Sequence, residues 1–169
     1  MHGIPHFCVS IAYELESRIE TSIIYDPIKD ELFQATRGNG AFLNGYPIKP
    51  SKIKDFEKAL IALGFPPTAY HLRERFMNAL KELIIEVNSL RIFGSAALNL
   101  AYVAAGRIDG DMEFGLSPWD VAAGWLIVEE AGALITDENG REEILKGNII
   151  AATPEIHPSL LKFAQEKIL

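Results

Sequence analysis

Only one cysteine occurs in the sequence, and this scarcity excludes two kinds of structure. A lone thiol cannot form an intramolecular disulfide, and it cannot build a zinc site from several cysteines. That residue, Cys8, lies between Phe7 and Val9 in an apolar stretch, where we expect a buried and inert thiol. The chemistry of the chain must therefore rest on other side chains.

Long apolar runs and a surplus of basic residues are missing too. The longest apolar run of the central stretch, Val121–Val128, is too short to span a bilayer, which takes about 20 residues, and Glu129 and Glu130 follow it. The N-terminus lacks the basic and apolar regions of a secretory signal. With 16 Lys and Arg against 23 Asp and Glu, the net charge of −7 argues against a broad surface for phosphate backbones. We therefore expect a soluble, cytoplasmic protein with neither nucleic acid nor membrane as a partner.

What the sequence does contain is enough apolar material for one hydrophobic core, or a little more than one, with 169 residues and 49% hydrophobic content. Its first part is predicted to be an antiparallel meander, because β-rich stretches alternate with the turn signals Gly38-Asn39-Gly40 and Asn44-Gly45. The expected strands are 7–14, 21–25, 31–36 and 41–43.

From about residue 59 the pattern changes to alternating strands and helices, which is typical of an α/β layer. The expected strands are 59–65, 90–93, 109–113, 133–136 and 148–152, and the expected helices are 70–87, 94–104, 118–128 and 158–169. We therefore predict an α+β/α/β fold. A boundary near residues 50–58 would separate an N-terminal meander (1–55) from a C-terminal α/β part (56–169).

Two helix starts in the stretch 91–132 point to the handling of oxyanions. Gly94-Ser95-Ala96-Ala97 follows a short apolar run, and Ser117-Pro118-Trp119-Asp120 opens a second helix. A glycine at a strand-to-helix turn lets a ligand approach the backbone, and a helix N-terminus offers unpaired N–H groups to an anion. A carboxylate such as Asp120 at the neighbouring helix start can hold a hard divalent cation, which prefers oxygen ligands.

A purely structural explanation competes with this interpretation. Ser95 and Asp120 are also residue types that are favoured as helix N-caps, because their side chains bond to nearby backbone N–H groups. Between the helix starts, Asp109, Asp111 and Glu113 alternate, so a strand would place all three carboxylates on one face. From the pattern alone, capping and ligand binding both remain open for Ser95 and Asp120.

The chain resembles the inositol monophosphatase family, and its bacterial branch in particular. The motifs that carry the resemblance are Gly94-Ser95-Ala96-Ala97, Asp109, Glu113, Pro118-Trp119-Asp120-Val121-Ala122-Ala123-Gly124 and Glu130-Ala131-Gly132. The segment 36–45 also resembles a hairpin of that family, so the match runs through most of the chain. The resemblance implies a layered αβαβα sandwich and a Mg²⁺-dependent phosphomonoesterase that acts on an inositol phosphate or a related sugar phosphate.

The resemblance also implies roles for individual residues. Asp120 matches the carboxylate that binds metal and contacts the substrate hydroxyl, and Glu113 matches the residue that hydrogen-bonds the inositol ring. Gly94, Ser95 and Ala96 match the helix-start segment that lies along the sugar. In such enzymes the metal ions bind the phosphate oxygens, activate the attacking water and stabilise the leaving alkoxide.

Part of the family's metal site would not be encoded in this sequence. The family's Glu-Glu and Asp-Pro-Ile-Asp-Gly-Thr motifs would lie upstream of His2, so the match is expected to cover only the C-terminal two-thirds of the family. Asp26-Pro27-Ile28 resembles the start of the second motif, but Lys29 and Asp30 follow it, and we expect a hairpin turn there. One carboxylate does not hold several Mg²⁺ ions, which each need several oxygen ligands, so the chain alone is expected to be inactive or nearly so.

Apolar side chains of the meander lead to a second functional hypothesis. We expect Val9, Ile11, Ile23, Phe33 and Phe42 to include side chains that are exposed as a patch or buried in a homodimer. A different class of function, a non-catalytic binding or interaction module, would use such a surface.

The histidines carry a weaker metal signal. His2 and His6 stand four positions apart, a spacing that suits two metal ligands on one helix, but Pro5 lies between them. We expect these two residues, together with His71 and His157, to be ordinary surface or loop residues.

Overall fold

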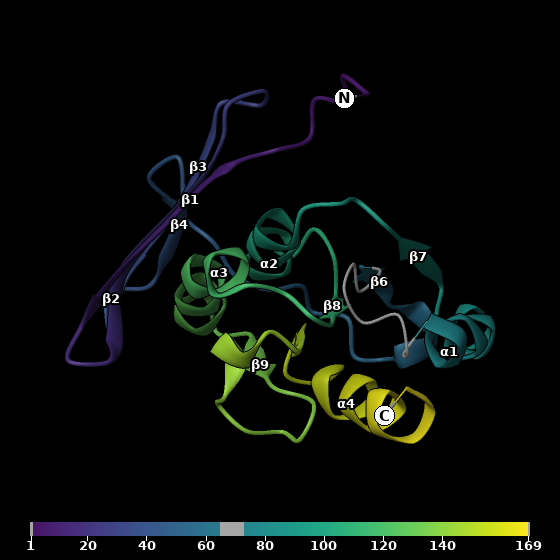
Figure 1. Ribbon diagram of the computed structural model, residues 1–169. Helices are drawn as coiled ribbons and strands as arrows, with labels where there is room; N and C mark the ends of the chain where they lie inside the picture. The colour runs from purple at the N-terminus through teal and green to yellow at the C-terminus, as the bar shows by residue number, and fades with distance from the viewer. Residues whose placement is uncertain (1, 65–72, 169) are drawn as a thin grey trace.

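The computed structural model describes residues 2–64 and 73–168 and contains two five-stranded sheets (Figure 1). The first sheet is an antiparallel meander whose strands follow one another in chain order. These strands are β1 (Val9–Leu15), β2 (Arg18–Asp26), β3 (Glu31–Thr36), β4 (Ala41–Leu43) and β5 (Tyr46–Pro47).

Tight turns set the register of the meander. Asn44 and Gly45 both have positive φ, 49° and 81°, which is the backbone that a two-residue hairpin loop requires. The Asn44 side chain accepts a hydrogen bond from Leu32 N at 2.8 Å and donates one to Asp30 O at 3.0 Å. The predicted strand at 31–36 and the strand at 41–43 are therefore confirmed with unchanged bounds.

The second sheet has the strand order β7-β6-β8-β10-β9. Its strands are β6 (Leu60–Leu63), β7 (Ser89–Arg91), β8 (Gly110–Glu113), β9 (Leu134–Thr136) and β10 (Ile149–Ala152). β6 pairs in parallel with β7 and β8, whereas β10 pairs antiparallel with β8 and β9. Every residue of β8 and β10 is buried, as expected for central strands covered on both faces.

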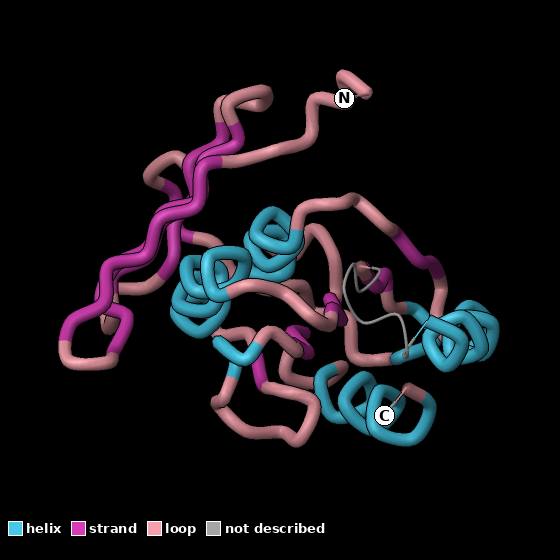
Figure 2. Tube along the Cα trace, viewed as in Figure 1, coloured by secondary structure: helices cyan, strands magenta, loops and turns pink. Residues whose placement is uncertain are grey.

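Four helices of the described chain complete the layers. They are α1 (Arg73–Glu86), α2 (Ala96–Ala104), α3 (Pro118–Ala131) and α4 (His157–Lys167). Figures 1 and 2 show α2 and α3 between the meander and the second sheet, and α1 and α4 on the other side of that sheet. The predicted layered sandwich of a meander and an α/β part is confirmed.

Two apolar clusters hold these layers together. One joins the inner face of the meander, including Ile24 and Phe33, to α2, α3 and the facing side of the second sheet. The other joins the opposite side of that sheet, including Met112, to α1 and α4. Because the first cluster contains residues from both predicted segments, 1–55 and 56–169 share a core, and their division stays a prediction.

A carboxylate clamp ties the meander to the far end of α3. Gly38 N donates a hydrogen bond of 2.8 Å to Glu130 Oε1, and Gly40 N donates one of 2.8 Å to Glu130 Oε2. Both glycines have positive φ, 76° and 84°, so the β3–β4 hairpin turns its N–H groups toward one anion. This contact fixes the helix whose first turn carries Asp120.

The outer face of the meander is apolar and open in the described structure. Val9, Ile11 and Tyr13 are 49%, 55% and 57% exposed, and Ile11 lies opposite Ile23 in the register. The prediction was wrong for Phe33, which is fully buried on the inner face. Side chains of neighbouring strand positions point to opposite faces, so Ile24 and Phe33 share the inner face and Ile23 does not.

Most differences from the predicted elements lie at their ends. The strand expected at 90–93 is Ser89–Arg91, and the strand expected at 59–65 is Leu60–Leu63. The start of the helix expected at 70–87, with His71, lies outside the described residues. In the described part of the chain, no helix combines the length and apolar character that membrane crossing requires.

Candidate functional site

A cavity of about 710 Å³ opens where the segment before β1, the connection from β7 to α2, the end of β8 and the start of α3 meet. Its lining includes all five residues that the resemblance singled out: Gly94, Ser95, Ala96, Glu113 and Asp120. These positions come from three different elements. The structure thus brings the candidate residues together, while their roles in binding stay predictions.

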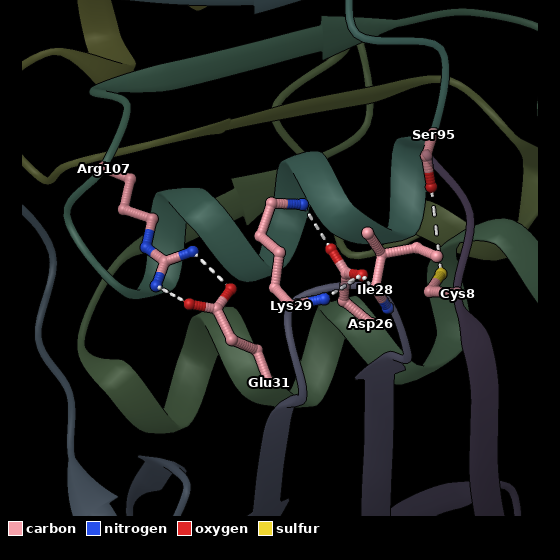
Figure 3. Close-up of polar contacts among 7 residues, drawn as sticks. All are labelled: Cys8, Asp26, Ile28, Lys29, Glu31, Ser95 and Arg107. Atoms are coloured by element: carbon pink, nitrogen blue, oxygen red, sulfur yellow. Dashed lines mark hydrogen bonds and ion pairs between the residues drawn. The ribbon is translucent and has the colours of Figure 1, made fainter. Parts of the chain in front are cut away.

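The first turn of α2 forms one wall of this cavity. Gly94 has a φ of 89°, which only glycine adopts readily, and Ser95 then occupies the N-cap position in extended conformation. The Ser95 side chain makes no capping hydrogen bond; its Oγ lies 3.8 Å from Cys8 Sγ instead (Figure 3). Ser95 therefore stands at the N-cap position, as the structural explanation predicted, but its hydroxyl group does not cap the helix.

Asp120 lines the cavity at the start of α3. The N-cap of this helix is Ser117, and Asp120 follows three residues later, where its Oδ2 accepts a hydrogen bond of 2.9 Å from Ser117 N. The interpretation of Asp120 as the N-cap was therefore wrong, because it is the reciprocal partner in a capping box. Its Oδ1 has no hydrogen-bond partner in residues 2–64 and 73–168, so capping and ligand binding are compatible.

A buried polar network holds Glu113, which lines the cavity. The Asn99 side-chain amide donates hydrogen bonds to Glu113 Oε1 at 2.8 Å and to Asp111 Oδ1 at 3.2 Å. Burial raises the pKa of Glu113 to about 7, with a further contribution from the negative charge of Asp120. Burial also raises the pKa of Asp111 well above its usual range, and the nearby Glu113 adds to this effect.

Gly64 makes room for the Glu113 carboxylate. A Cβ atom at position 64 would collide with Glu113 Oε2. Both residues line the cavity, so the absence of a side chain at Gly64 lets the carboxylate reach it.

Asp109 does not join this network, although the sequence predicted one face for all three carboxylates. β8 begins at Gly110, and the Asp109 carboxylate accepts hydrogen bonds from Leu60 N, at 2.7 Å, and from the Ser51 hydroxyl. It thereby fixes the start of β6. The prediction of one shared face was wrong because Asp109 precedes the strand.

Two further residues of the cavity, His6 and Cys8, were not assigned to a site from the sequence. The His6 ring lies 6.0 Å from the Phe93 ring, and burial together with the charge of Lys29 lowers its pKa. Cys8 is only half-buried, and burial raises the pKa of its thiol, which favours the protonated, less reactive form. No local pattern marks either residue, because their partners lie far away in the sequence.

His157 also differs from the expectation of an ordinary surface histidine. It is only 5% exposed, and its Nε2 lies 3.1 Å from the Thr136 hydroxyl. Burial lowers its pKa. Its position at the first residue of α4, packed against the second sheet, explains the burial.

The predicted hairpin turn at Asp26 is confirmed. The Asp26 side chain is fully buried and accepts hydrogen bonds from Ile28 N at 3.0 Å, Lys29 N at 3.2 Å and Lys29 Nζ at 2.5 Å (Figure 3). Burial alone would raise its pKa, but these donors hold the pKa below the usual value. Its carboxylate is thus fully engaged in the turn.

The family implies Mg²⁺, and the side chains of the cavity can be compared with what this ion needs. Mg²⁺ takes six oxygen ligands in near-ideal octahedral geometry. Within the described residues, no group of three or more His, Cys, Asp or Glu side chains is arranged to hold a metal ion. Asp120 Oδ1 is one suitable donor, so the residues described here do not make a complete Mg²⁺ centre.

Comparisons with known proteins identify relatives of this chain. The relative named Nus factor SuhB from Escherichia coli K12 is 45% identical over 166 residues, which is 98% of this chain and 62% of the relative. The relative of the same name from Pseudomonas aeruginosa is 44% identical over 168 residues, or 98% of this chain and 62% of its own length. This chain therefore spans somewhat less than two thirds of these relatives.

Solved structures of related proteins resemble this chain in fold. The native crystal structure of extragenic suppressor protein suhB from Bartonella henselae has a TM-score of 0.93 and 45% identity, covering 99% of this chain and 64% of that one. Inositol monophosphatase from Anabaena sp. PCC 7120 has a TM-score of 0.85 and 39% identity, covering 96% of this chain and 65% of that one. The family model described as the inositol monophosphatase family matches residues 1–169. The chain belongs to the inositol monophosphatase family.

Proposed function

We propose that the cavity is the substrate-binding side of a Mg²⁺-dependent phosphomonoesterase site, and that its substrate is a phosphate ester of inositol or of a related sugar. The observation that carries this proposal is the convergence of Gly94, Ser95, Ala96, Glu113 and Asp120 on one cavity. Their elements are separated in the sequence, and the fold brings them to a single place. The family membership of the chain supports the same reaction class.

The chemistry of the walls suits a polyol with an anionic group. The first N–H groups of α2 have no acceptor within the helix and favour negative charge. Glu113 accepts hydrogen bonds when ionised, so it matches the hydroxyl groups of a ring. Asp120 offers Oδ1 to a cation or to a hydroxyl while Oδ2 stays in the capping box.

We propose further that the 169-residue chain alone has no turnover, or almost none. Asp120 supplies one oxygen ligand, and Mg²⁺ needs several more. The test measures phosphate release from inositol 1-phosphate with Mg²⁺, for the wild type and for Asp120→Asn. We expect both at background; turnover in the wild type that Asp120→Asn abolishes would contradict the proposed inactivity.

Binding tests the substrate side separately from turnover. Amide chemical shifts are recorded by NMR while inositol 1-phosphate and Mg²⁺ are added. We expect changes at Gly94, Ser95, Ala96 and Glu113, and smaller changes in Glu113→Gln. Changes confined to residues away from the cavity would argue against this assignment.

A non-catalytic interaction module is the second candidate, and two observations favour it. Relatives with 44–45% identity carry the name Nus factor SuhB, and the outer face of β1 exposes Val9, Ile11 and Tyr13. We propose a cytoplasmic homodimer as the form of such a module, without nucleic acid as a partner because of the net charge of −7. A concentration-independent dimer in analytical ultracentrifugation, changed to a monomer by Ile11→Asp, supports it; a monodisperse wild-type monomer does not.

A further inference from the structure

Two buried oxygen atoms in the network that holds Glu113 have no hydrogen-bond partner in the described part of the chain. They are Asn99 Oδ1 and Asp111 Oδ2. Both belong to side chains that are already bonded to each other, because Asn99 Nδ2 donates to Asp111 Oδ1 at 3.2 Å. Buried polar atoms normally find partners, so two unpaired acceptors on adjacent side chains need an explanation.

The surroundings of Asp111 do not compensate a negative charge. Asp111 is fully buried and lies opposite Ala62 of β6 and Ala151 of β10. The sequences of α2, β6 and β10 contain no charged residue. Among the described residues, the charges that act on this pair are acidic: Glu113 on β8 acts on Asp111, and Asp120 at the start of α3 acts on Glu113.

The lysines of the neighbouring helix do not reach this site either. Met112 packs in the cluster with α1 and α4, so Asp111 points to the opposite face of the sheet. Lys162 and Lys167 of α4 pair with surface carboxylates of Glu166 and Glu82. Within residues 2–64 and 73–168, an ionised Asp111 would therefore be a buried charge without a cation, which is strongly unfavourable.

A proton on Asp111 would account both for the unpaired oxygen atoms and for the missing counter-charge. A neutral carboxyl group has a donor as well as an acceptor, and this complements a primary amide, which also has both. We propose that Asp111 is a neutral carboxylic acid that acts as a positioning residue: it orients the Asn99 amide, whose other N–H then fixes Glu113 in the cavity. Burial raises the pKa of Asp111, which agrees with this assignment.

The arrangement engages one carboxylate oxygen of Glu113 and leaves the other available to a ligand. Asn99 holds Oε1 at 2.8 Å, whereas Oε2 lies against Gly64 at the cavity wall. Asp111 and Glu113 together then carry at most one negative charge. If the proposed function holds, this single, oriented acceptor selects ring hydroxyl groups and avoids the repulsion that two carboxylates would exert on a phosphate ester.

Substitution of Asp111 separates a neutral acid from a charged one. Asp111→Asn is uncharged and offers an acceptor and N–H donors in place of the acceptor and O–H donor of a neutral acid, so we expect its melting temperature and the pKa of Glu113 to stay close to those of the wild type. The pKa is followed by the ¹³C shift of the Glu113 carboxyl group during a pH titration. Asp111→Leu removes the donor and the acceptor, and we expect Glu113 to lose its fixed orientation, seen as averaged side-chain shifts.

A matched control uses the neighbouring aspartate. Asp109 accepts two hydrogen bonds from donors, so an amide nitrogen in its place would face an N–H or O–H group. We expect Asp109→Asn to lower the melting temperature, in contrast to Asp111→Asn. An infrared band of a neutral carboxylic acid at a pH above about 7, where Glu113 is ionised, would support the proposal directly if it is present in the wild type and absent in Asp111→Asn.

Each result bears on one claim only. A drop of about one unit or more in the pKa of Glu113 in Asp111→Asn would show that a negative charge had been removed, and would overturn the proposal. If Asp111→Leu does not fold, the titration of Asp111→Asn still decides. If the carboxyl titrations agree but inositol 1-phosphate changes no shift in the cavity, the proposed function fails and the positioning role of Asp111 stands.

Discussion

Two fully buried aspartates, Asp26 in the β2–β3 turn and Asp111 in β8, show how differently one residue type is used in this protein. Asp26 receives three hydrogen bonds, including one from the ammonium group of Lys29. Asp111 receives a side-chain hydrogen bond from Asn99 and a backbone hydrogen bond from Met112, but no ammonium group, and the charge of another carboxyl group, Glu113, raises its pKa. The compensated aspartate builds a turn, whereas the uncompensated one lies beside the candidate site, as perturbed groups often do.

The two regions also respond to pH with opposite signs. The pKa of Asp26 is lowered in the folded state, so its contribution to stability is present above its usual pKa and is lost as the pH falls through the folded value. The pKa of Glu113 is raised from 4.5 to about 7, so folding is favoured below 4.5 and this contribution is lost as the pH rises through about 7. One region therefore weakens in acid and the other near neutrality.

The largest expected effect follows from this difference at Glu113. Glu113→Gln removes the titrating group but keeps an acceptor for Asn99. Between about pH 4 and pH 9, we expect the wild type to lose on the order of 3 kcal/mol of unfolding free energy that the variant retains. Urea unfolding at both pH values measures this. Parallel pH profiles of the two proteins would show that the carboxyl group is not buried in solution.

A smaller effect is expected when the compensated aspartate is removed. Asp26→Ala leaves the N–H groups of Ile28 and Lys29 without their acceptor and opens a small cavity. We expect about 2 kcal/mol of destabilisation, and this figure leaves out the Lys29 ammonium because it is 41% exposed and can bind water. Thermal unfolding at neutral pH provides the measurement. The control is Asp55→Ala, which breaks an exposed pair with Lys58 and should leave stability unchanged.

The contrast between the two aspartates could be predicted only in part from the sequence. Lys29 lies three positions after Asp26, so the turn is local, and it was predicted; the ion pair between the two side chains was found only in the structure. The unpartnered state of Asp111 depends on Asn99, twelve positions earlier, and on β6 and β10, which come from distant parts of the chain. Local patterns do not contain such information.

The same distinction applies to the cavity. Gly94, Ser95, Ala96, Glu113 and Asp120 could be singled out because their motif resembles a family, and the structure places them around one space. The role of Asp120 in a capping box is also local, since its partner is Ser117. Cys8 lies 87 positions before Ser95, and nothing in its own neighbourhood indicates that the two side chains meet.

Burial was the hardest property to predict for single side chains. Phe33 and Ile23 are both apolar strand residues, but only the register decides which face each one occupies. His157 looked like a loop residue because the strand that covers it, with Thr136, is separated from it in sequence. Asp109 was placed with Asp111 because alternation gives the face of a strand but not the residue at which the strand begins.

The smallest predicted effect concerns the cationic surroundings of the β2–β3 turn. The Arg107 guanidinium binds both oxygens of Glu31 at 2.6 and 2.7 Å (Figure 3), and it lies 5.1 Å from the ring centre of Tyr102. The Lys29 ammonium lies 5.9 Å from the centre of the same ring. Two cationic side chains therefore lie over one aromatic ring near the β2–β3 turn. In contrast, no cationic side chain of the described residues pairs with Asp111 in β8.

Arg107→Lys tests whether the shape of the cation matters in that arrangement. A lysine keeps the charge but loses the two-pronged contact and the planar stacking, so we expect a loss of about 1 kcal/mol, most of it retained at high salt. Unfolding free energies at low and high salt separate the two contributions, because screening weakens a charge pair more than a stacking contact. If the loss of unfolding free energy in Arg107→Lys vanishes at high salt, charge alone holds Arg107 in place. The β2–β3 turn would then differ from β8 in its electrostatics but not in its packing.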